Sequence, residues 1–74
     1  MTPNELENSI NDTFGEDIIK ITEDDKNVII SFHRSGEPKL YAIKNIKELV
    51  STDNRWECNS NSSPTDDMWI FQYN

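Results

Sequence analysis

The sequence predicts an α+β domain in which an N-terminal helix packs on an antiparallel sheet of about four strands, with a short second helix. Three observations predict this class: a helix-start pattern opens the chain, Ile-rich stretches separated by polar turns follow, and an aromatic stretch closes it. With 74 residues the chain is expected to form a single compact domain, 1–74. Its core is thin, because a chain near this size hides only about 60% of its unfolded surface on folding.

The first helix is predicted over Pro3–Phe14. Thr2 stands just before it, and Glu5 follows Thr2 by three residues, which is the pattern of a capping box with proline in the first turn. Gly15 is the expected C-terminal cap. Three apolar residues at four-residue spacing give the helix one buried stripe. The stripe consists of Leu6, Ile10 and Phe14.

Three strands are predicted next, over residues 17–22, 27–33 and 39–44. The first is rich in Ile, and the second alternates apolar residues onto one face. The polar segments between them, 23–26 and 34–38, have the length of hairpin turns, so the three strands are expected to form an antiparallel meander. The apolar face of the second strand carries Val28, Ile30 and Phe32.

A short helix is predicted over residues 46–50, with Asn45 as its cap and Glu48 three residues later. The stretch that follows is polar and contains a run of Asn and Ser, so a flexible loop is expected at about 58–67. Trp56 is the only apolar anchor in this part of the chain.

The last strand is predicted over residues 68–73. Its aromatic residues Trp69, Phe71 and Tyr73 alternate onto one face. Core packing is the favoured use of this face, and a partner-binding interface stays open because Trp and Tyr are enriched in interfaces. A terminal segment this apolar is expected to pair with the sheet or with its copy in a second subunit, which makes a homodimer a separate expectation.

The acidic residues are concentrated at the start of the chain. The net charge is -7, from 14 Asp or Glu and 7 Lys or Arg, and the first 25 residues alone carry -7. Residues 26–50 carry +3 and residues 51–74 carry -3. This sign of charge argues against direct binding to nucleic acid or to an anionic membrane. The expected partner-binding residues are Glu5, Glu7, Asp12, Glu16, Asp17, Glu23, Asp24 and Asp25.

No pattern in the sequence predicts catalysis, a metal site or a cofactor. His33 is the one histidine and Cys58 the one cysteine, and no nucleophile motif or phosphate-binding glycine loop accompanies them. The acidic turn at 23–27 lacks the ligand spacing of an EF-hand. The chain carries no secretory signal pattern and no disulfide pair, so a cytoplasmic protein is expected.

The position of the carboxylates indicates a function. Glu5 and Asp12 lie two turns apart on one side of the predicted helix, about 10.5 Å at 1.5 Å per residue. In size and acidity the chain resembles, as a class, the virus-encoded inhibitors that mimic DNA. The resemblance implies a non-enzymatic inhibitor that occupies the basic surface of a nucleic-acid-binding protein, encoded by a phage against a host protein. The alternative is a small adaptor or self-associating interaction module that uses the aromatic C-terminal strand.

Overall fold

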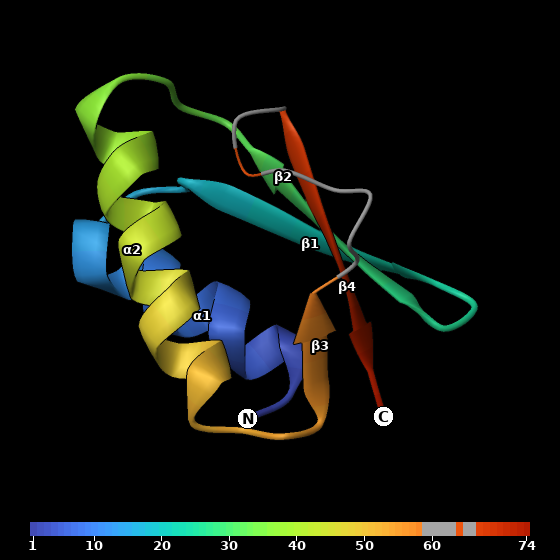
Figure 1. Ribbon diagram of the computed structural model, residues 1–74. Helices are drawn as coiled ribbons and strands as arrows, with labels where there is room; N and C mark the ends of the chain where they lie inside the picture. Colours follow the sequence, from blue (N-terminus) through green and yellow to red (C-terminus); the bar gives the residue numbers. More distant parts are fainter. Residues whose placement is uncertain (59–63, 65–66) are drawn as a thin grey trace.

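Two helices and four strands make up the part of the chain that the structure, a computed structural model, describes: residues 1–58, 64 and 67–74. The sheet order is β1-β2-β4-β3, and every neighbouring pair is antiparallel. The predicted α+β class, with an N-terminal helix and a four-stranded antiparallel sheet, is confirmed (Figure 1). The elements are α1 (Pro3–Phe14), β1 (Ile19–Asp24), β2 (Asn27–Phe32), α2 (Glu37–Ser51), β3 (Trp56–Cys58) and β4 (Met68–Tyr73).

Helix α1 has the bounds and both caps that the sequence predicts. The Glu5 N–H donates to Thr2 Oγ1 at 3.2 Å, and the Thr2 N–H donates to the Glu5 carboxylate at 3.3 Å, which completes the capping box. Gly15 ends the helix at φ 69°, a left-handed conformation that glycine adopts without steric strain. Leu6 and Ile10 are buried and Phe14 is half-buried, as the stripe requires.

The prediction of a third strand over residues 39–44 is wrong, because these residues belong to α2. The helix also absorbs the short helix predicted over 46–50 and runs from Glu37 to Ser51. Pro38 lies in its first turn, where proline is tolerated, and Ala42 and Ile46 are buried one turn apart. A short apolar run between two lysines fits a strand as well as a helix, but the Leu, Lys, Ala and Glu residues of the segment are good helix formers.

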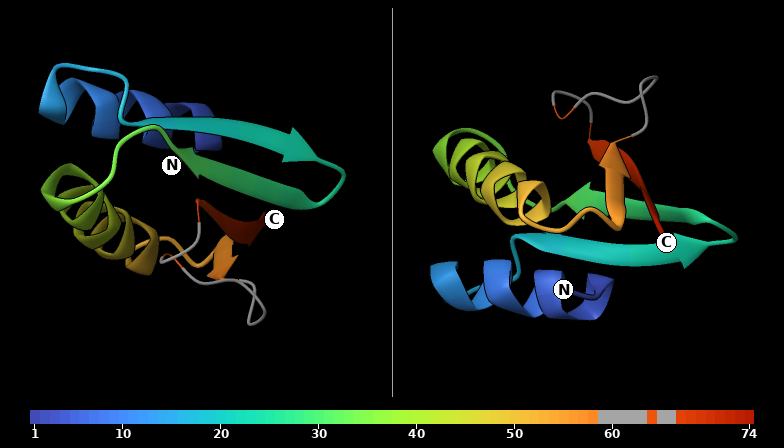
Figure 2. Two further views of the ribbon diagram at one scale, coloured as in Figure 1. Left: turned by 90° about the horizontal axis from the view of Figure 1, so that it is seen from above. Right: turned by 60° about the horizontal axis from the view of Figure 1, so that its bottom comes forward.

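Both helices cover the same face of the sheet. Residues at alternate positions of all four strands join the buried residues of α1 and α2 in a single core cluster, and α1 contacts both β1 and α2 (Figures 1 and 2). The other face carries alternating polar and partly exposed apolar side chains. The cluster consists of Leu6, Ile10, Ile18, Ile19, Val28, Ile30, Ala42, Ile46, Trp56, Trp69 and Phe71.

Strand β4 lies inside the sheet, between β2 and β3, so the apolar C-terminal segment pairs within its own chain. The short strand β3 lies in a stretch for which the sequence analysis predicts no strand. Three residues are too few to show an alternation of apolar and polar side chains. Trp56 anchors β3 as predicted: it is buried, its ring centroid lies 5.7 Å from that of Phe71, and its Nε1 donates to the Met1 carbonyl at 2.9 Å. Most of the loop expected at 58–67 lies outside the described residues.

The first hairpin is tighter than predicted. Only Asp25 and Lys26 connect β1 and β2, and Asp25 has φ 57°, which a two-residue loop requires of at least one position. The strand predicted over 17–22 instead begins at Ile19 and extends to Asp24, where the tight turn starts. Neither helix, in the part of the chain that the structure describes, is long and apolar enough to cross a membrane.

Candidate functional site: the acidic side of α1 and the first hairpin

The eight predicted partner-binding residues all lie on or next to α1 and β1. Seven of them are exposed, and Glu7 is half-buried. We refer to the seven exposed residues as the acidic side. They are Glu5, Asp12, Glu16, Asp17, Glu23, Asp24 and Asp25.

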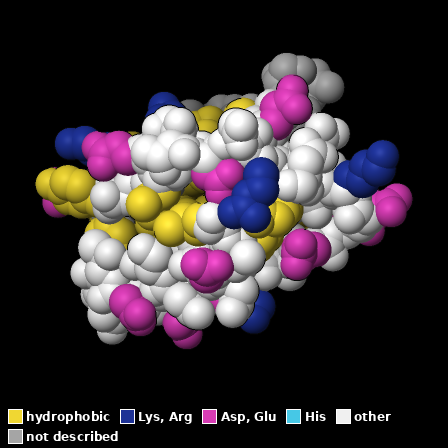
Figure 3. Space-filling view, turned by 90° about the horizontal axis from the view of Figure 1, so that it is seen from below, with side chains coloured by type: hydrophobic (Ala, Val, Ile, Leu, Met, Phe, Trp, Pro, Cys, Tyr) yellow, Lys and Arg dark blue, Asp and Glu magenta, His cyan; other side chains and the backbone are white. Residues whose placement is uncertain are grey.

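The acidic side is extended rather than compact. Glu16 and Asp17 lie where α1 gives way to β1, whereas Asp24 and Asp25 lie at the hairpin tip, the opposite end of β1 (Figures 1 and 2). The first and last of the six residues of β1 are five steps apart, which is about 17 Å at about 3.3 Å per residue. Figure 3 shows acidic side chains standing apart from one another, with Lys and Arg side chains between them and a band of hydrophobic side chains across the middle of the same view. The acidic side is therefore a series of separate negative charges along α1 and β1 and not a continuous negative surface.

Glu7 makes a contact within the fold that the sequence did not indicate. β1 is an edge strand, and the backbone groups of Ile19 and Ile21 point away from β2 toward α1. The Ile21 N–H donates to Glu7 Oε1 at 2.6 Å. Glu7 is therefore a structural residue of the β1 edge, and its use in partner binding stays a prediction.

Asn11, one turn after Glu7, binds the start of this edge, and sequence reasoning assigned it no role. Its Oδ1 accepts from the N–H groups of Ile18 and Ile19 at 2.9 and 3.0 Å, and its Nδ2 donates to the Ile19 carbonyl at 3.0 Å. Glu7 and Asn11 are four residues apart and lie on one side of the helix, beside the apolar stripe. This spacing is the sequence signal that could have shown that both side chains bind the edge of the sheet. The two side chains fix the orientation of α1, and with it that of the acidic side.

Two of the acidic residues have partners within the chain. Thr2 donates to Glu5 from its side chain and from its backbone, and these hydrogen bonds lower the pKa of the Glu5 carboxyl. Glu16 lies 3.5 Å from Arg34, with both side chains about half exposed, so this ion pair contributes little to stability. The other acidic residues of this side form no ion pair with any described residue, so they can approach a cationic surface unhindered.

The start of α1 is tied down by a small ionic network. Asp53 accepts from the Met1 ammonium at 2.7 Å and from Arg55 Nη2 at 2.9 Å. Hydrogen bonds from the Arg55 side chain, followed by that from the ammonium group, hold the pKa of the Asp53 carboxyl well below its usual range. The same contact raises the pKa of Arg55, so the pair stays ionised through the neutral range.

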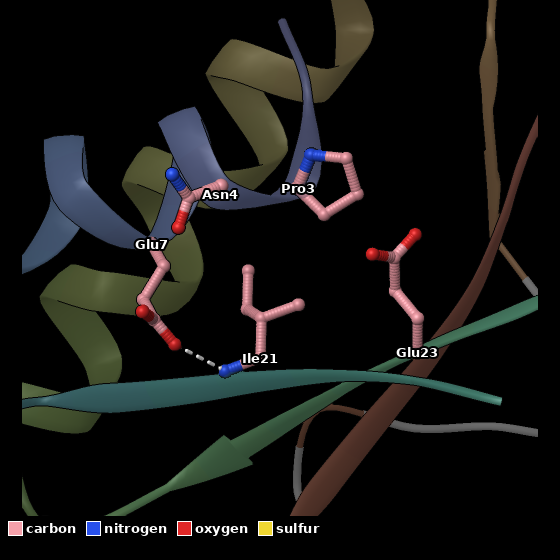
Figure 4. Close-up of a pocket in the computed structure, with 5 residues that line it drawn as sticks. All are labelled: Pro3, Asn4, Glu7, Ile21 and Glu23. Atoms are coloured by element: carbon pink, nitrogen blue, oxygen red, sulfur yellow. Dashed lines mark hydrogen bonds between the residues drawn. The ribbon is translucent and has the colours of Figure 1, made fainter.

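A small hollow lies at the open end of the β1 edge. Its volume is about 90 Å³, and Figure 4 shows the Glu23 carboxylate directed toward it while Glu7 reaches the Ile21 N–H. Pockets that hold small-molecule substrates usually occupy about 300–1,000 Å³. This hollow is too small for such a substrate. It is lined by Pro3, Asn4, Glu7, Ile21 and Glu23.

Titratable groups that could form a reactive pair lie far apart. Cys58 is opposite Phe71, which pairs with Val28, whereas His33 lies five residues beyond Val28 along β2, about 16 Å away. The structure therefore does not bring together the one histidine and the one cysteine. The Trp69 Nε1 instead donates to Cys58 Sγ at 3.2 Å. Within residues 1–58, 64 and 67–74, no group of three His, Cys, Asp or Glu side chains is placed to hold a metal ion.

The aromatic residues of β4 are not presented as a surface. Trp69 and Phe71 are buried in the core with ring centroids 4.7 Å apart, and Tyr73 is half-buried, with the Arg55 guanidinium 5.1 Å from its ring. This burial favours core packing for Trp69 and Phe71, whereas Tyr73 keeps part of its side chain exposed, so the interface considered for these three residues stays a prediction. Among the described residues, the exposed large apolar ones are Leu40 and Tyr41 on α2 and Met68 at the start of β4.

Comparisons with protein-family models, with curated proteins and with solved structures give no match, so the assignment of this site depends on its geometry and charge.

Proposed function

We propose that the protein is a non-enzymatic inhibitor whose acidic side occupies the basic surface of a nucleic-acid-binding protein by mimicking the charge of nucleic acid. The observation that carries the proposal is the exposure of seven carboxylates on and beside α1 and β1, where Lys20, Lys26 and Arg34 are the neighbouring bases. Such a side sets up a negative potential that attracts a cationic groove and accelerates association. A cytoplasmic location and a phage origin belong to the same proposal.

The rigidity of α1 supports this function. The capping box fixes one end of the helix, the hydrogen bonds of Glu7 and Asn11 fix its orientation against β1, and the backbone of Gly15 closes the other end. Charges held on a rigid scaffold lose little conformational entropy on binding, so more of the electrostatic attraction appears as affinity. Asp12 in particular extends from the last turn of this helix.

The test is capture of a partner from lysate, followed by two challenges of the captured complex. Raising the salt from about 50 to about 500 mM is expected to weaken binding roughly tenfold or more, because salt screens exposed charges. Duplex DNA is expected to displace this protein, because both occupy the same cationic surface. A complex that is indifferent both to salt and to DNA would contradict the proposal.

Two amide variants with the same net charge locate the binding side. The first neutralises four residues of the acidic side, and the second neutralises four exposed acids elsewhere. We expect the first variant to bind the captured partner at least about tenfold more weakly and the second to bind as the wild type does. Equal loss in both variants would show that only total charge matters. The first carries Asp12→Asn, Asp17→Asn, Asp24→Asn and Asp25→Asn, and the second carries Glu37→Gln, Glu48→Gln, Glu57→Gln and Asp67→Asn.

A further inference from the structure

The first two turns of α2 carry an exposed apolar pair among charged residues of both signs. Leu40 and Tyr41 are 65% and 57% exposed, more than any other large apolar residue that the structure describes. Lys44 and Lys47 are exposed on the same side of the helix, one and two turns later. We call these four residues the α2 patch.

The fold does not account for the α2 patch. Ala42 and Ile46 are the residues that attach α2 to the core, and they lie on the opposite side of the helix. Lys44 and Lys47 form no ion pair with any residue in the described ranges. An exposed tyrosine is typical of a protein-binding surface. Glu37 and Glu48 are exposed on the same side of the helix, so Lys44 and Lys47 offer two local positions for acidic groups of a partner and do not make the whole side basic.

The chain itself supplies an acidic surface beside this patch. Helices α1 and α2 are in contact, and the Glu16–Arg34 ion pair joins the end of α1 to the loop that leads into α2. Exposed Asp12 and Asp17 therefore lie at the same end of the molecule as the patch (Figure 1). Within one copy, an acidic and a basic–apolar surface are neighbours.

We propose that the α2 patch binds the Asp12–Asp17 end of α1 in a second copy of this chain. A twofold axis between the two helix pairs would form this contact twice, because each copy offers both halves of it. Nucleic acid and anionic membranes fit the patch less well, since the net charge of -7 repels them. Repulsion between two copies is screened beyond about 8 Å at physiological salt, whereas contacting pairs are much closer. The contact uses Asp12 and Asp17, which also belong to the acidic side, so a dimer and the proposed partner would compete for these two residues.

Charge exchange between the two surfaces tests the contact. One variant carries Lys44→Glu with Lys47→Glu, and the other carries Asp12→Lys with Asp17→Lys. Sedimentation equilibrium from about 10 µM to about 1 mM is expected to show a wild-type dimer and a dimer at least tenfold weaker for each variant alone. An equimolar mixture of the two variants restores complementary pairs at both contacts, so native mass spectrometry is expected to show the heterodimer at near wild-type strength.

A control variant separates this contact from general charge effects. Lys20→Glu with Lys26→Glu changes the net charge by the same amount as the α2 variant but lies on β1 and the hairpin, so its dimer is expected to match the wild type. A wild-type chain that stays monomeric at about 1 mM overturns the proposal, whatever else the patch binds. Dimerisation of either reversed variant at wild-type strength, or a mixture without heterodimer, also overturns it. Far-ultraviolet circular dichroism confirms that every variant is folded.

Discussion

Replacing Asn11 with alanine tests how α1 is held against the edge of the sheet. The substitution removes two acceptor contacts to the N–H groups of Ile18 and Ile19 and one donor contact to the Ile19 carbonyl. These backbone groups point away from β2, so no neighbouring strand can replace the lost partner. The expected result is a large loss of stability from a residue that is polar and only half-buried.

The size of the loss follows from the number of contacts. Three hydrogen bonds at about 1 kcal/mol each give about 3 kcal/mol. Alanine favours the helix by about 0.6 kcal/mol relative to asparagine, which leaves a net loss of about 2 to 3 kcal/mol. A chain of 74 residues has a total stability of roughly 4 to 11 kcal/mol. One side chain is thus expected to carry about a quarter or more of the stability of the domain.

Urea unfolding followed by circular dichroism measures this effect, with Asn8→Ala as the matched control. Asn8 is exposed on the same helix and forms no hydrogen bond with a described residue, so its replacement is expected to raise the unfolding free energy slightly. The slope of unfolding free energy against urea should stay constant in both variants. An Asn11→Ala variant that loses less than about 0.5 kcal/mol relative to Asn8→Ala would refute the role assigned to this side chain.

Three further predictions concern stability. Because the pKa of Asp53 is lowered in the folded state, its contribution to the unfolding free energy is present above the unfolded-state pKa of about 3.9 and is lost as the pH falls below that value. Urea midpoints measured from pH 5 to pH 2 should therefore fall more steeply for the wild type than for Asp53→Asn. Leu6→Ala, at a fully buried position, should lower the unfolding free energy by about 3 kcal/mol, whereas Leu40→Ala should change it by less than about 0.5 kcal/mol; similar losses would contradict the core assignment. Gly15→Ala should cost about 1 kcal/mol from its positive φ alone, since no atom lies within 4 Å of the added Cβ, and an unchanged thermal midpoint would argue against the left-handed cap.

Signals that act within a few residues were sufficient to predict the elements that contacts between nearby residues stabilise. The capping box at Thr2 and Glu5, the apolar stripe and Gly15 gave α1 its bounds, because each signal acts within a few residues of the chain. The alternation in β2 and β4 placed the core face of both strands, since a strand buried on one side alternates with a period of two. The segment around Leu40 was misjudged because a run of four apolar residues between two lysines fits a strand as well as a helix, while the helical spacing of Ala42 and Ile46 becomes decisive only over a longer window.

The candidate site was determined in part by sequence and in part by contacts distant in sequence. Sequence alone determined the number of carboxylates and their concentration in the first 25 residues, because charge is a property of each residue. Only the tertiary structure decided which of them face outward: Glu7 and Asn11 bind an edge strand whose open side exists only once the sheet has formed. Tertiary packing likewise buried Trp69 and left Tyr41 exposed, because an aromatic residue is buried only where a neighbouring element covers it.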